Sequence, residues 1–494
     1  MFAFFLSSGL FLGWSLGAND AANVFGTAVG SRMIRFATAA VLCSIFVIIG
    51  SVVSGAGASE TLGKLGSITA IAGAFVVAFA AAVSVYLMTK AGYPVSTSQA
   101  IVGAIIGWNL FSGSLTDYDS LTTIVATWVV CPFLSAIFAV SFYKLFVPVI
   151  KTCSVSMFRL DALTRYLLIL AGIFGSYSLG ANNIANVMGV FVPVAPLSDI
   201  SLFGMVSLNA AQQLFFIGGV AIAVGVFTYS KRVMMTVGEG IFELSPVAAL
   251  VVVWAHSMVL FLFASQGLKG LLVSHGLPSL PLVPVSSSQA IVGAVIGIGL
   301  LRGGRSIRWR LVGGIASGWV ATPVIAAGVS FMLLFFVQNV FQQETYRPVT
   351  YRVTAENVDR IGRAGMDTGY LAPLVGEEFS RAVDFRDALS RSKGEPVTAG
   401  ETATVMHYTE VDELEITEEK IAELDTTWIT AEQREAVEAL TGRVFIHTWR
   451  FDEALARLSP QWRLSEHDRD FNRALTNKRQ YMYRIFRRHD TASH

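Results

Sequence analysis

Charged side chains are scarce in the first two thirds of the chain. Of its 36 Lys and Arg and 35 Asp and Glu residues, 23 fall within residues 1–340 and 48 within residues 341–494. Only about 7% of the first part is charged, whereas soluble domains average about 25%. This scarcity excludes a single soluble domain. It predicts an integral membrane part, followed by a water-soluble tail.

Cysteines and catalytic constellations are also few. The three cysteines (Cys43, Cys131 and Cys153) are scattered and none lies in the tail, which argues against a disulfide framework and against metal-ligand spacing. A net charge of +1 gives no excess of positive charge with which to bind nucleic acid. The membrane part has no nucleophile–base pattern and no Walker sequence. We therefore expect neither an enzyme nor a protein with a bound cofactor.

Long charge-free windows fill the first 340 residues. Each is about as long as the roughly 20 residues with which a helix crosses a bilayer. There are ten such segments: 1–19, 36–59, 65–89, 91–116, 120–143, 166–198, 200–230, 244–268, 270–301 and 311–343. The first lacks a basic n-region, so we expect it to be retained as a span. The predicted fold class is an all-α integral membrane protein with some re-entrant or broken helices, plus a mainly helical soluble domain at the C-terminus.

Two motifs occur twice, in the same order. GANDAAN at residues 17–23 returns as GANNIAN at 180–186, and PVSTSQAIVGA at 94–104 returns as PVSSSQAIVGA at 284–294 with one difference. This pattern predicts a duplicated five-segment unit. The predicted domains are a first repeat over 1–150, a basic cytoplasmic connector over 151–165, a second repeat over 166–340 and a soluble tail over 341–494.

An odd number of crossings in each unit would turn the second copy upside down. With the N-terminus outside, thirteen basic residues fall in inside loops and two, Lys64 and Lys269, in outside loops. This bias follows the positive-inside rule. We therefore predict an inverted repeat in the cell membrane, with both termini extracytoplasmic.

The first motif places polar side chains within an apolar segment. Asn19, Asp20 and Asn23 gather at one face or break of a helix, where carboxylate and amide oxygens form a hard donor set for Na⁺ or a proton. The second copy offers Asn183 and Asn186, and Asn183 replaces the carboxylate by a neutral amide. We expect these four residues, Asp20, Asn23, Asn183 and Asn186, to bind the coupling cation, with Na⁺ at Asp20 and Asn23.

The second motif places a hydroxyl run directly after a proline. Proline suits the first turn of a helix, so free backbone N–H groups and the positive dipole end would lie beside hydroxyl and amide donors. Such an end holds an oxyanion without Lys or Arg. We name residues 96–99 the first cradle and residues 286–289 the second cradle. The residues expected to contact the anion are Ser96, Thr97, Ser98, Gln99, Ser286, Ser287, Ser288, Gln289, Asn19 and Asn182.

Other features favour structural roles. Gly103 and Gly107, with Gly293 and Gly297, give small-residue faces suited to close helix packing. His256 and His275 are isolated, and their pattern favours core or interface roles over a proton relay. In the tail we expect helices over 411–425 and over 431–440, the latter capped by Thr430. The basic, aromatic stretch 469–488 is either a membrane-surface or partner helix, or a solvated one.

These motifs, together with TVGEGIFELSP at 236–246, resemble the inorganic phosphate transporter (PiT) family of cation-coupled symporters. The resemblance spans about 1–340 and excludes the tail. It implies an inverted-repeat fold with both termini extracytoplasmic. It also implies that phosphate is held by the two Ser/Thr-rich hairpin ends and the Asn/Asp motifs, with Na⁺ or H⁺ nearby.

The chain departs from the family pattern at three positions. Many relatives have Asp at the position of Asn183, and many have His at those of Gln99 and Gln289. Phosphate at pH 7 still has a proton to donate to a carboxylate, whereas sulfate has none. The loss of one carboxylate therefore keeps sulfate, or another tetrahedral oxyanion, as the main alternative substrate.

An alternative of another functional class is an oxyanion channel, or a sensor in which the tail is the output module. Contacts with membrane lipid are expected, and homo-oligomerisation stays open.

Overall fold

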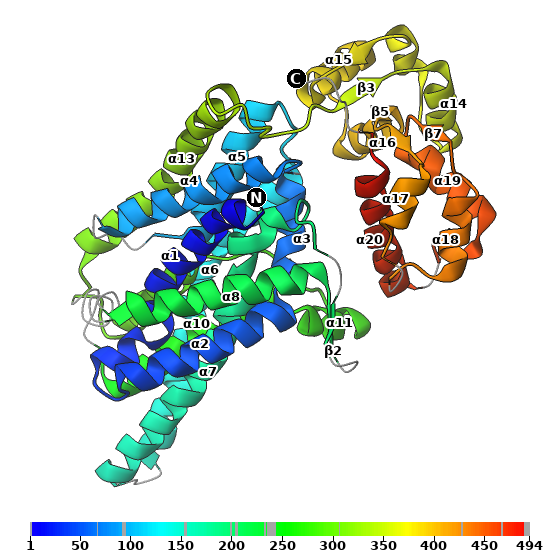
Figure 1. The fold of residues 1–494 in the computed structure, drawn as a ribbon. Coiled ribbons are helices and arrows are strands. Elements are labelled where there is room, and N and C mark those ends of the chain that lie inside the picture. Colours follow the sequence, from blue (N-terminus) through cyan, green and yellow to red (C-terminus); the bar gives the residue numbers. More distant parts are fainter. Residues whose placement is uncertain are drawn as a thin grey trace. The chain divides into compact units, whose positions relative to one another are not determined.

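The computed structural model divides the chain into two compact units, Met1–Arg347 and Pro348–His494 (Figure 1). We call them the membrane unit and the tail. The residues that the structure describes are 2–66, 68–90, 95–152, 156–197, 200–202, 206–231, 234, 244–305, 307–425, 428–465 and 468–488. Cys153, Pro94 and residues 236–243 of the TVGEGIFELSP motif therefore lie outside the described residues.

The membrane unit is almost wholly helical. In its first half the helices are α1 (Phe2–Gly30), α2 (Phe36–Ser54), α3 (Ala56–Leu65), α4 (Ile71–Lys90), α5 (Thr97–Ser112) and α6 (Tyr118–Thr152). In its second half the elements are α7 (Met157–Met188), η1 (Gly189–Phe191), β1 (Ile200–Leu202), β2 (Val206–Leu208), α8 (Ala210–Thr228), α10 (Pro246–Ala264), α11 (Gln266–Ser274), α12 (Ser287–Leu301) and α13 (Trp309–Asn339). Strands β1 and β2 pair antiparallel, with Ile200 opposite Leu208. Much of the stretch predicted as a connector, 151–165, belongs to α7.

Within the described ranges, seven helices are long and apolar enough to cross a membrane. They are α1, α2, α4, the part of α6 from Tyr118 to Ile150, α8, α10 and α13. Helices α5 and α12, of 16 and 15 residues, are shorter than the roughly 20 residues that span a bilayer. The predicted segment 270–301 is divided into the end of α11, non-helical residues 275–286 and α12. The prediction of a helical, multi-pass membrane fold with broken segments is confirmed.

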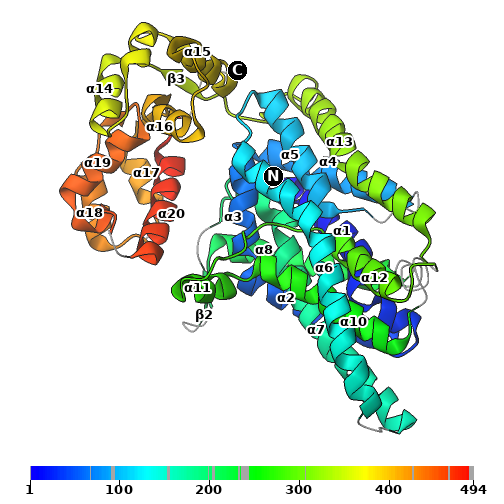
Figure 2. The ribbon, with the colours of Figure 1, turned by 180° about the vertical axis from the view of Figure 1, so that it is seen from behind.

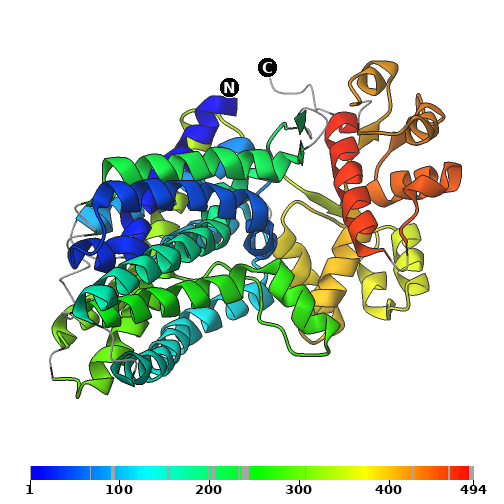
Figure 3. The same cartoon turned by 90° about the horizontal axis from the view of Figure 1, so that it is seen from below.

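The two halves of the membrane unit interlock. Helix α5 packs along α13 and α12 packs along α6, so each short helix pairs with a long helix of the other half. Figures 1 and 2 show α13 alongside α4 and α5, and Figure 3 shows α2 and α8 running side by side. A Cβ atom on Gly103 would lie 2.1 Å from the carbonyl oxygen of Pro323, and one on Gly293 2.2 Å from that of Pro132. Close packing at these glycines is therefore as predicted, while the inverted relation of the halves stays a prediction.

The tail consists of short helices and small sheets around two apolar cores. Its first lobe comprises β3 (Thr350–Arg352), α14 (Ala355–Arg363), η2 (Gly369–Leu374), β4 (Glu378–Phe379), α15 (Ala382–Lys393), α16 (Ala399–Thr409) and β5 (Glu410–Val411). Its second lobe comprises β6 (Leu414–Glu415), α17 (Glu418–Ala422), α18 (Ala431–Glu438), β7 (Val444–Phe445), α19 (Thr448–Leu458), η3 (Pro460–Trp462) and α20 (Arg469–Phe486). The strands form antiparallel sheets of order β4-β3-β5 and β6-β7, with Tyr351 opposite Phe379 and Leu414 opposite Phe445.

The two lobes of the tail are related to each other, which sequence reasoning missed. In the first lobe the amide of Gly376 donates to the Val353 carbonyl at 2.8 Å, and in the second the amide of Gly442 donates to Ile416 at the same distance. Both glycines have positive φ, 94° and 80°, a conformation that favours glycine. The following sequences, FSRAVDFRDALSR from 379 and FIHTWRFDEALAR from 445, place Phe, Phe, Ala and Leu at equal spacing. The tail is therefore a tandem of two similar modules.

The helix expected over 411–425 is wrong. That stretch contains part of β5, then β6 and the five-residue α17. Leu414 and Glu415 pair with β7, and Thr417 caps the new helix by accepting from the amide of Lys420.

The Thr430 cap is confirmed, since Thr430 and Gln433 form a capping box at the start of α18. Helix α20 is confirmed, and its apolar residues Leu475, Met482 and Phe486 are buried in the tail's own core. That apolar face is not available to a membrane surface.

A largely buried carboxyl group, that of Glu410, contributes to the pH dependence of the tail's stability. Burial, with a smaller contribution from nearby Asp412, raises the pKa of Glu410 from 4.5 to about 7, although Arg487 opposes the rise. Between these values the unfolded chain releases a proton that the folded tail retains, so stability falls as pH rises from about 4.5 to 7. We expect Glu410→Gln to remove the contribution of Glu410 and so to make the fall in stability with rising pH shallower. Hydrogen exchange of tail amides in the full-length protein, corrected for intrinsic rates, would measure it. Exposed Glu435→Gln serves as the control, and an equal slope in Glu410→Gln would contradict the assignment.

Candidate functional site

The first Asn/Asp motif lies in the middle of a continuous helix, not at a break. Asn19, Asp20 and Asn23 are all buried on α1. The Asn19 side-chain amide donates to Asp20 Oδ1 at 3.0 Å and to the carbonyl of Val95 at 3.2 Å. Gly17 permits this burial, because a Cβ there would lie 1.9 Å from the Ile222 carbonyl oxygen of α8. Close packing on α8 thus leaves the polar side chains enclosed by protein.

The second copy occupies the corresponding part of α7. Asn182, Asn183 and Asn186 are fully buried, and the Asn186 amide donates to Asn183 Oδ1 at 3.0 Å. Asn183 itself donates to the Leu179 carbonyl of its own helix at 3.2 Å. The carboxylate of Asp20 accepts a hydrogen bond from Asn19. The Asn183 side chain accepts one as well, but it also donates a hydrogen bond to the preceding turn of its helix. The replacement therefore changes the hydrogen bonding as well as the charge.

Both cradles lie at the start of a helix, as predicted. Ser96 caps α5 by accepting from the Gln99 amide at 3.3 Å, and Ser286 caps α12 by accepting from the Gln289 amide at 3.2 Å. All eight cradle residues are buried. The first turn of a helix leaves N–H groups without partners in that helix. Each cradle therefore brings backbone donors, hydroxyl groups and a positive dipole end into the protein interior.

The structure joins the four polar motifs into one site. The Asn23 amide of α1 donates to Ser287 Oγ of the second cradle at 3.0 Å, and the Asn186 amide of α7 donates to Ser98 Oγ of the first cradle at 2.8 Å. Ser98 in turn donates at 3.1 Å to the carbonyl of Val285, the residue that directly precedes the second cradle. Asn182 lies 3.4 Å from the Val283 carbonyl. Each half of the chain thus supplies side chains that bind the cradle of the other half.

Several buried polar atoms in this site have no hydrogen-bond partner among the described residues. They are Thr97 Oγ1, Gln99 Oε1, Asn182 Oδ1, Asn186 Oδ1 and Gln289 Oε1. Buried polar atoms are nearly always paired, so a concentration of unpaired ones indicates a place that receives a ligand. Four of the five are amide oxygens, which are hard ligands for a cation. In the described ranges no group of three His, Cys, Asp or Glu side chains could hold a metal.

His256 belongs to this site, although sequence reasoning assigned it to the core or an interface. It lies on α10, fully buried, with Nε2 3.0 Å from Ser287 Oγ. A single His in an apolar segment gives no signal of a partner that lies 31 residues further along the chain. The backbone carbonyls of Val95, Val283 and Val285 were also missed, because no side-chain pattern marks them.

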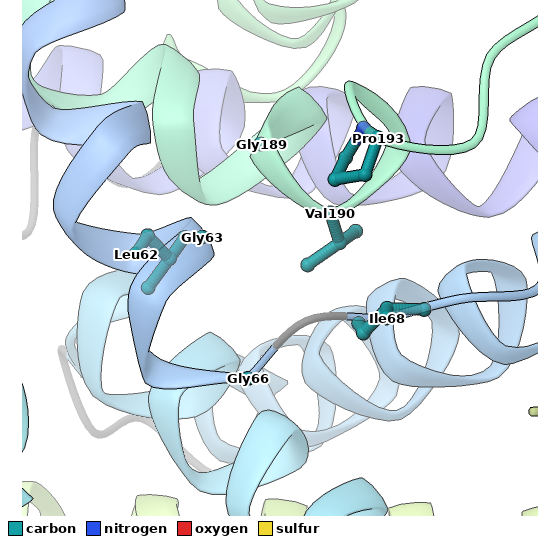
Figure 4. A pocket seen from close by; sticks show the side chains of 7 residues that line it. All are labelled: Leu62, Gly63, Gly66, Ile68, Gly189, Val190 and Pro193. Carbon is teal, nitrogen blue, oxygen red and sulfur yellow. The ribbon is translucent and has the colours of Figure 1, made fainter. Parts of the chain in front are cut away.

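A hollow lies between α3 and η1 (Figure 4). It is lined by Leu62, Gly63, Gly66, Ile68, Gly189, Val190 and Pro193. Its lining residues carry no polar side chain. The polar site formed by the four motifs is therefore the better candidate.

Comparison with known proteins gives consistent results. The chain matches the phosphate transporter family over residues 16–330 and 277–375. Several relatives, including the next two, carry the name "putative phosphate permease". The protein of Methanocaldococcus jannaschii is 27% identical, with 64% of this chain and 92% of the relative covered. That of Pyrococcus furiosus is 26% identical, with 66% and 93% covered. A solved structure named the sodium-dependent phosphate transporter has a TM-score of 0.53 and 22% identity, with 68% of this chain and 98% of that chain covered, and it supports the fold.

Proposed function

The chain belongs to the phosphate transporter family, and we propose that it is a secondary symporter that imports inorganic phosphate with Na⁺ or H⁺ by alternating access. It is a multi-pass membrane protein of a transporter family, and phosphate is the substrate of that family. The observation that carries the proposal is the joined site, in which two helix N-termini face the Asn/Asp motifs. The basic loops favour an orientation with both termini extracytoplasmic.

The anion would bind between the two cradles. Their donors are hydroxyl groups and free N–H groups at the starts of α5 and α12, and neither cradle contains Lys or Arg. Helix N-termini bind tetrahedral anions through these groups and the helix dipole. Asn19 and Asn182 lie beside the cradles through their contacts with Val95 and Val283. A neutral donor set holds an anion without the strong ion pairs that would slow its release.

The coupling cation would bind next to the anion. Asp20 supplies the charge, and amide oxygens of Asn23, Asn183 and Asn186 supply neutral ligands, with Na⁺ at Asp20 and Asn23. The unpaired oxygen of Asn186 fits this role. A cation bound here would offset the charge of phosphate inside the protein. Binding of each ion would therefore strengthen binding of the other, which is the physical basis of symport.

Alternating access would use the cross-connections between the halves. The hydrogen bonds of Asn23 to Ser287 and of Asn186 to Ser98 join α1 to α12 and α7 to α5. Movement of α5 with α13, and of α12 with α6, would break and remake them. The substrate would then be released to one side or the other around a site that stays near the middle of the fold.

Substrate choice is tested by competition. Phosphate can donate its proton to the Asp20 carboxylate, whereas sulfate would meet that carboxylate without a proton to share. We expect sulfate to inhibit radiolabelled phosphate uptake into proteoliposomes at least about tenfold more weakly than unlabelled phosphate does, since a hydrogen bond to a charged group contributes about 1.5–3 kcal/mol. Equal inhibition by both anions, or uptake of sulfate alone, would overturn phosphate as the substrate.

The cradles are tested by removing single hydroxyl groups. Ser98 accepts from Asn186 and donates to Val285, and Ser288 lies 3.1 Å from Ser286 Oγ. We expect Ser98→Ala and Ser288→Ala each to raise the KM for phosphate about tenfold, because the first removes the hydroxyl that holds the first cradle to Asn186 and Val285 and the second removes a hydroxyl of the second cradle. Ser84→Ala is the matched control, since Ser84 bonds only to the Ala80 carbonyl of its own helix. An unchanged KM in both cradle variants would refute the cradle.

A further inference from the structure

His256 and Asn23 converge on one atom, the hydroxyl oxygen of Ser287. The Asn23 amide nitrogen lies 3.0 Å from that oxygen, and His256 Nε2 lies 3.0 Å from it. All three side chains are buried, and His256 has no exposed surface. The contact joins α10 to the start of α12, inside the second cradle.

The direction of the His256 hydrogen bond follows from its other ring nitrogen. Nδ1 of His256 is buried and has no partner among the described residues. If the ring carried its single proton on Nδ1, a buried N–H group would stay unpaired, which is rarer and more costly than an unpaired acceptor. The proton therefore belongs on Nε2, which donates to Ser287. A doubly protonated ring would donate from Nε2 as well.

With two hydrogen-bond donors at its oxygen, the Ser287 hydroxyl has only its hydrogen left for a further bond. A hydroxyl group has two acceptor lone pairs and one hydrogen, and Asn23 and His256 occupy both lone pairs. No hydrogen bond within the described ranges uses the Ser287 hydrogen. Ser98 differs, because its hydrogen is donated to the Val285 carbonyl. Thr97, which the repeat aligns with Ser287, has an unpaired hydroxyl that no neighbour holds in place.

We propose that His256 is a positioning residue that fixes Ser287 as an O–H donor to the transported oxyanion. The inference rests on the proposed function and adds an unequal role for the two cradles. The Ser287 hydroxyl can only donate a hydrogen bond to the anion. The anion oxygen that accepts this bond must therefore be unprotonated. The proton of a hydrogen phosphate would then face another part of the site.

The test compares variants of the full-length protein in proteoliposomes with radiolabelled phosphate. We expect His256→Leu to raise the KM about tenfold while the maximal rate stays within about twofold, since the hydroxyl loses its orientation but the transport cycle remains. His256→Gln keeps an amide donor near the Nε2 position and should stay within about threefold of the wild-type KM. Ser287→Ala should raise the KM similarly, and the double variant with His256→Leu should be no worse. Ser257→Ala is the control, because the Ser257 hydroxyl bonds to the Val253 carbonyl of α10 and lies 3.5 Å from the Ala171 carbonyl of α7, neither of which belongs to a cradle.

Three results would overturn the inference. They are an unchanged KM in His256→Leu, an equal loss in His256→Gln, and multiplied losses in the double variant, which would mean independent actions. If His256→Leu does not fold, His256→Asn replaces it, because its shorter amide does not reach Ser287. Absence of phosphate uptake by the wild type would overturn the proposed function and this inference together. Wild-type uptake with an unchanged His256→Leu would overturn the inference alone.

Discussion

Asp20→Asn is expected to reduce cation-coupled phosphate uptake more than a hundredfold. Asp20 is buried on α1, and the second copy of its motif has already lost its carboxylate to Asn183. The variant would leave the paired motifs with no negative charge for Na⁺ or a proton. Removing a charge that a buried cation requires typically costs about 3 kcal/mol or more, which corresponds to a factor above one hundred. Initial uptake rates in proteoliposomes measure the effect.

The substitution preserves shape, so folding can be checked separately. Asn183 shows that the fold accommodates an amide at the corresponding position of α7. The variant should therefore elute as a single species and unfold at a temperature close to that of the wild type. Asn183→Asp is the informative partner, because it restores the second carboxylate and should alter the ratio of cation to phosphate. Full coupled uptake by a folded Asp20→Asn protein would refute the cation role of Asp20.

Gly103→Leu is expected to prevent assembly of the membrane unit. A Cβ atom at Gly103 would lie 2.1 Å from the carbonyl oxygen of Pro323 and 2.6 Å from its Cα atom, so α5 and α13 would have to separate. Overpacking typically costs about 1–3 kcal/mol, and the cost here is at the upper end or above it because the clash is with backbone and leucine adds a larger side chain. We expect loss of monodisperse protein in size-exclusion chromatography.

The matched control for this helix crossing is Gly328→Ala. Gly328 lies on α13 as well, but apart from the backbone of its own helix no described atom lies within 4 Å of the position that its Cβ would take. This variant should express and elute like the wild type. Normal assembly of Gly103→Leu would show that α5 and α13 do not pack as described.

The sequence predicted the site's components better than its connections. The duplicated motifs, the helix starts at the two cradles and the glycine faces all follow from local composition. The hydrogen bond of Asn23 to Ser287 joins residues 264 positions apart. Neither segment has a local pattern that identifies the other as its partner. The contact of His256 with Ser287 was missed for the same reason.

The tail illustrates the limits of pattern within a short stretch. Residues 411–425 have the spacing of an amphipathic helix, yet Leu414 and Ile416 are buried beside β7. Strand pairing with a segment thirty residues away outweighed the local helical preference. The tandem modules were recognisable only once Gly376 and Gly442 were seen to make the same hydrogen bonds.

The central claim is that phosphate and a cation bind together at one site and move together. It is tested most directly by radiolabelled phosphate uptake into proteoliposomes that contain phosphate at the outside concentration. The measurement compares an inward Na⁺ gradient, an inward proton gradient and no gradient, at clamped membrane potential. The account predicts internal phosphate above the outside concentration with one of the gradients, and no accumulation without either. Equilibration to equal concentrations under all three conditions would contradict symport and indicate a channel.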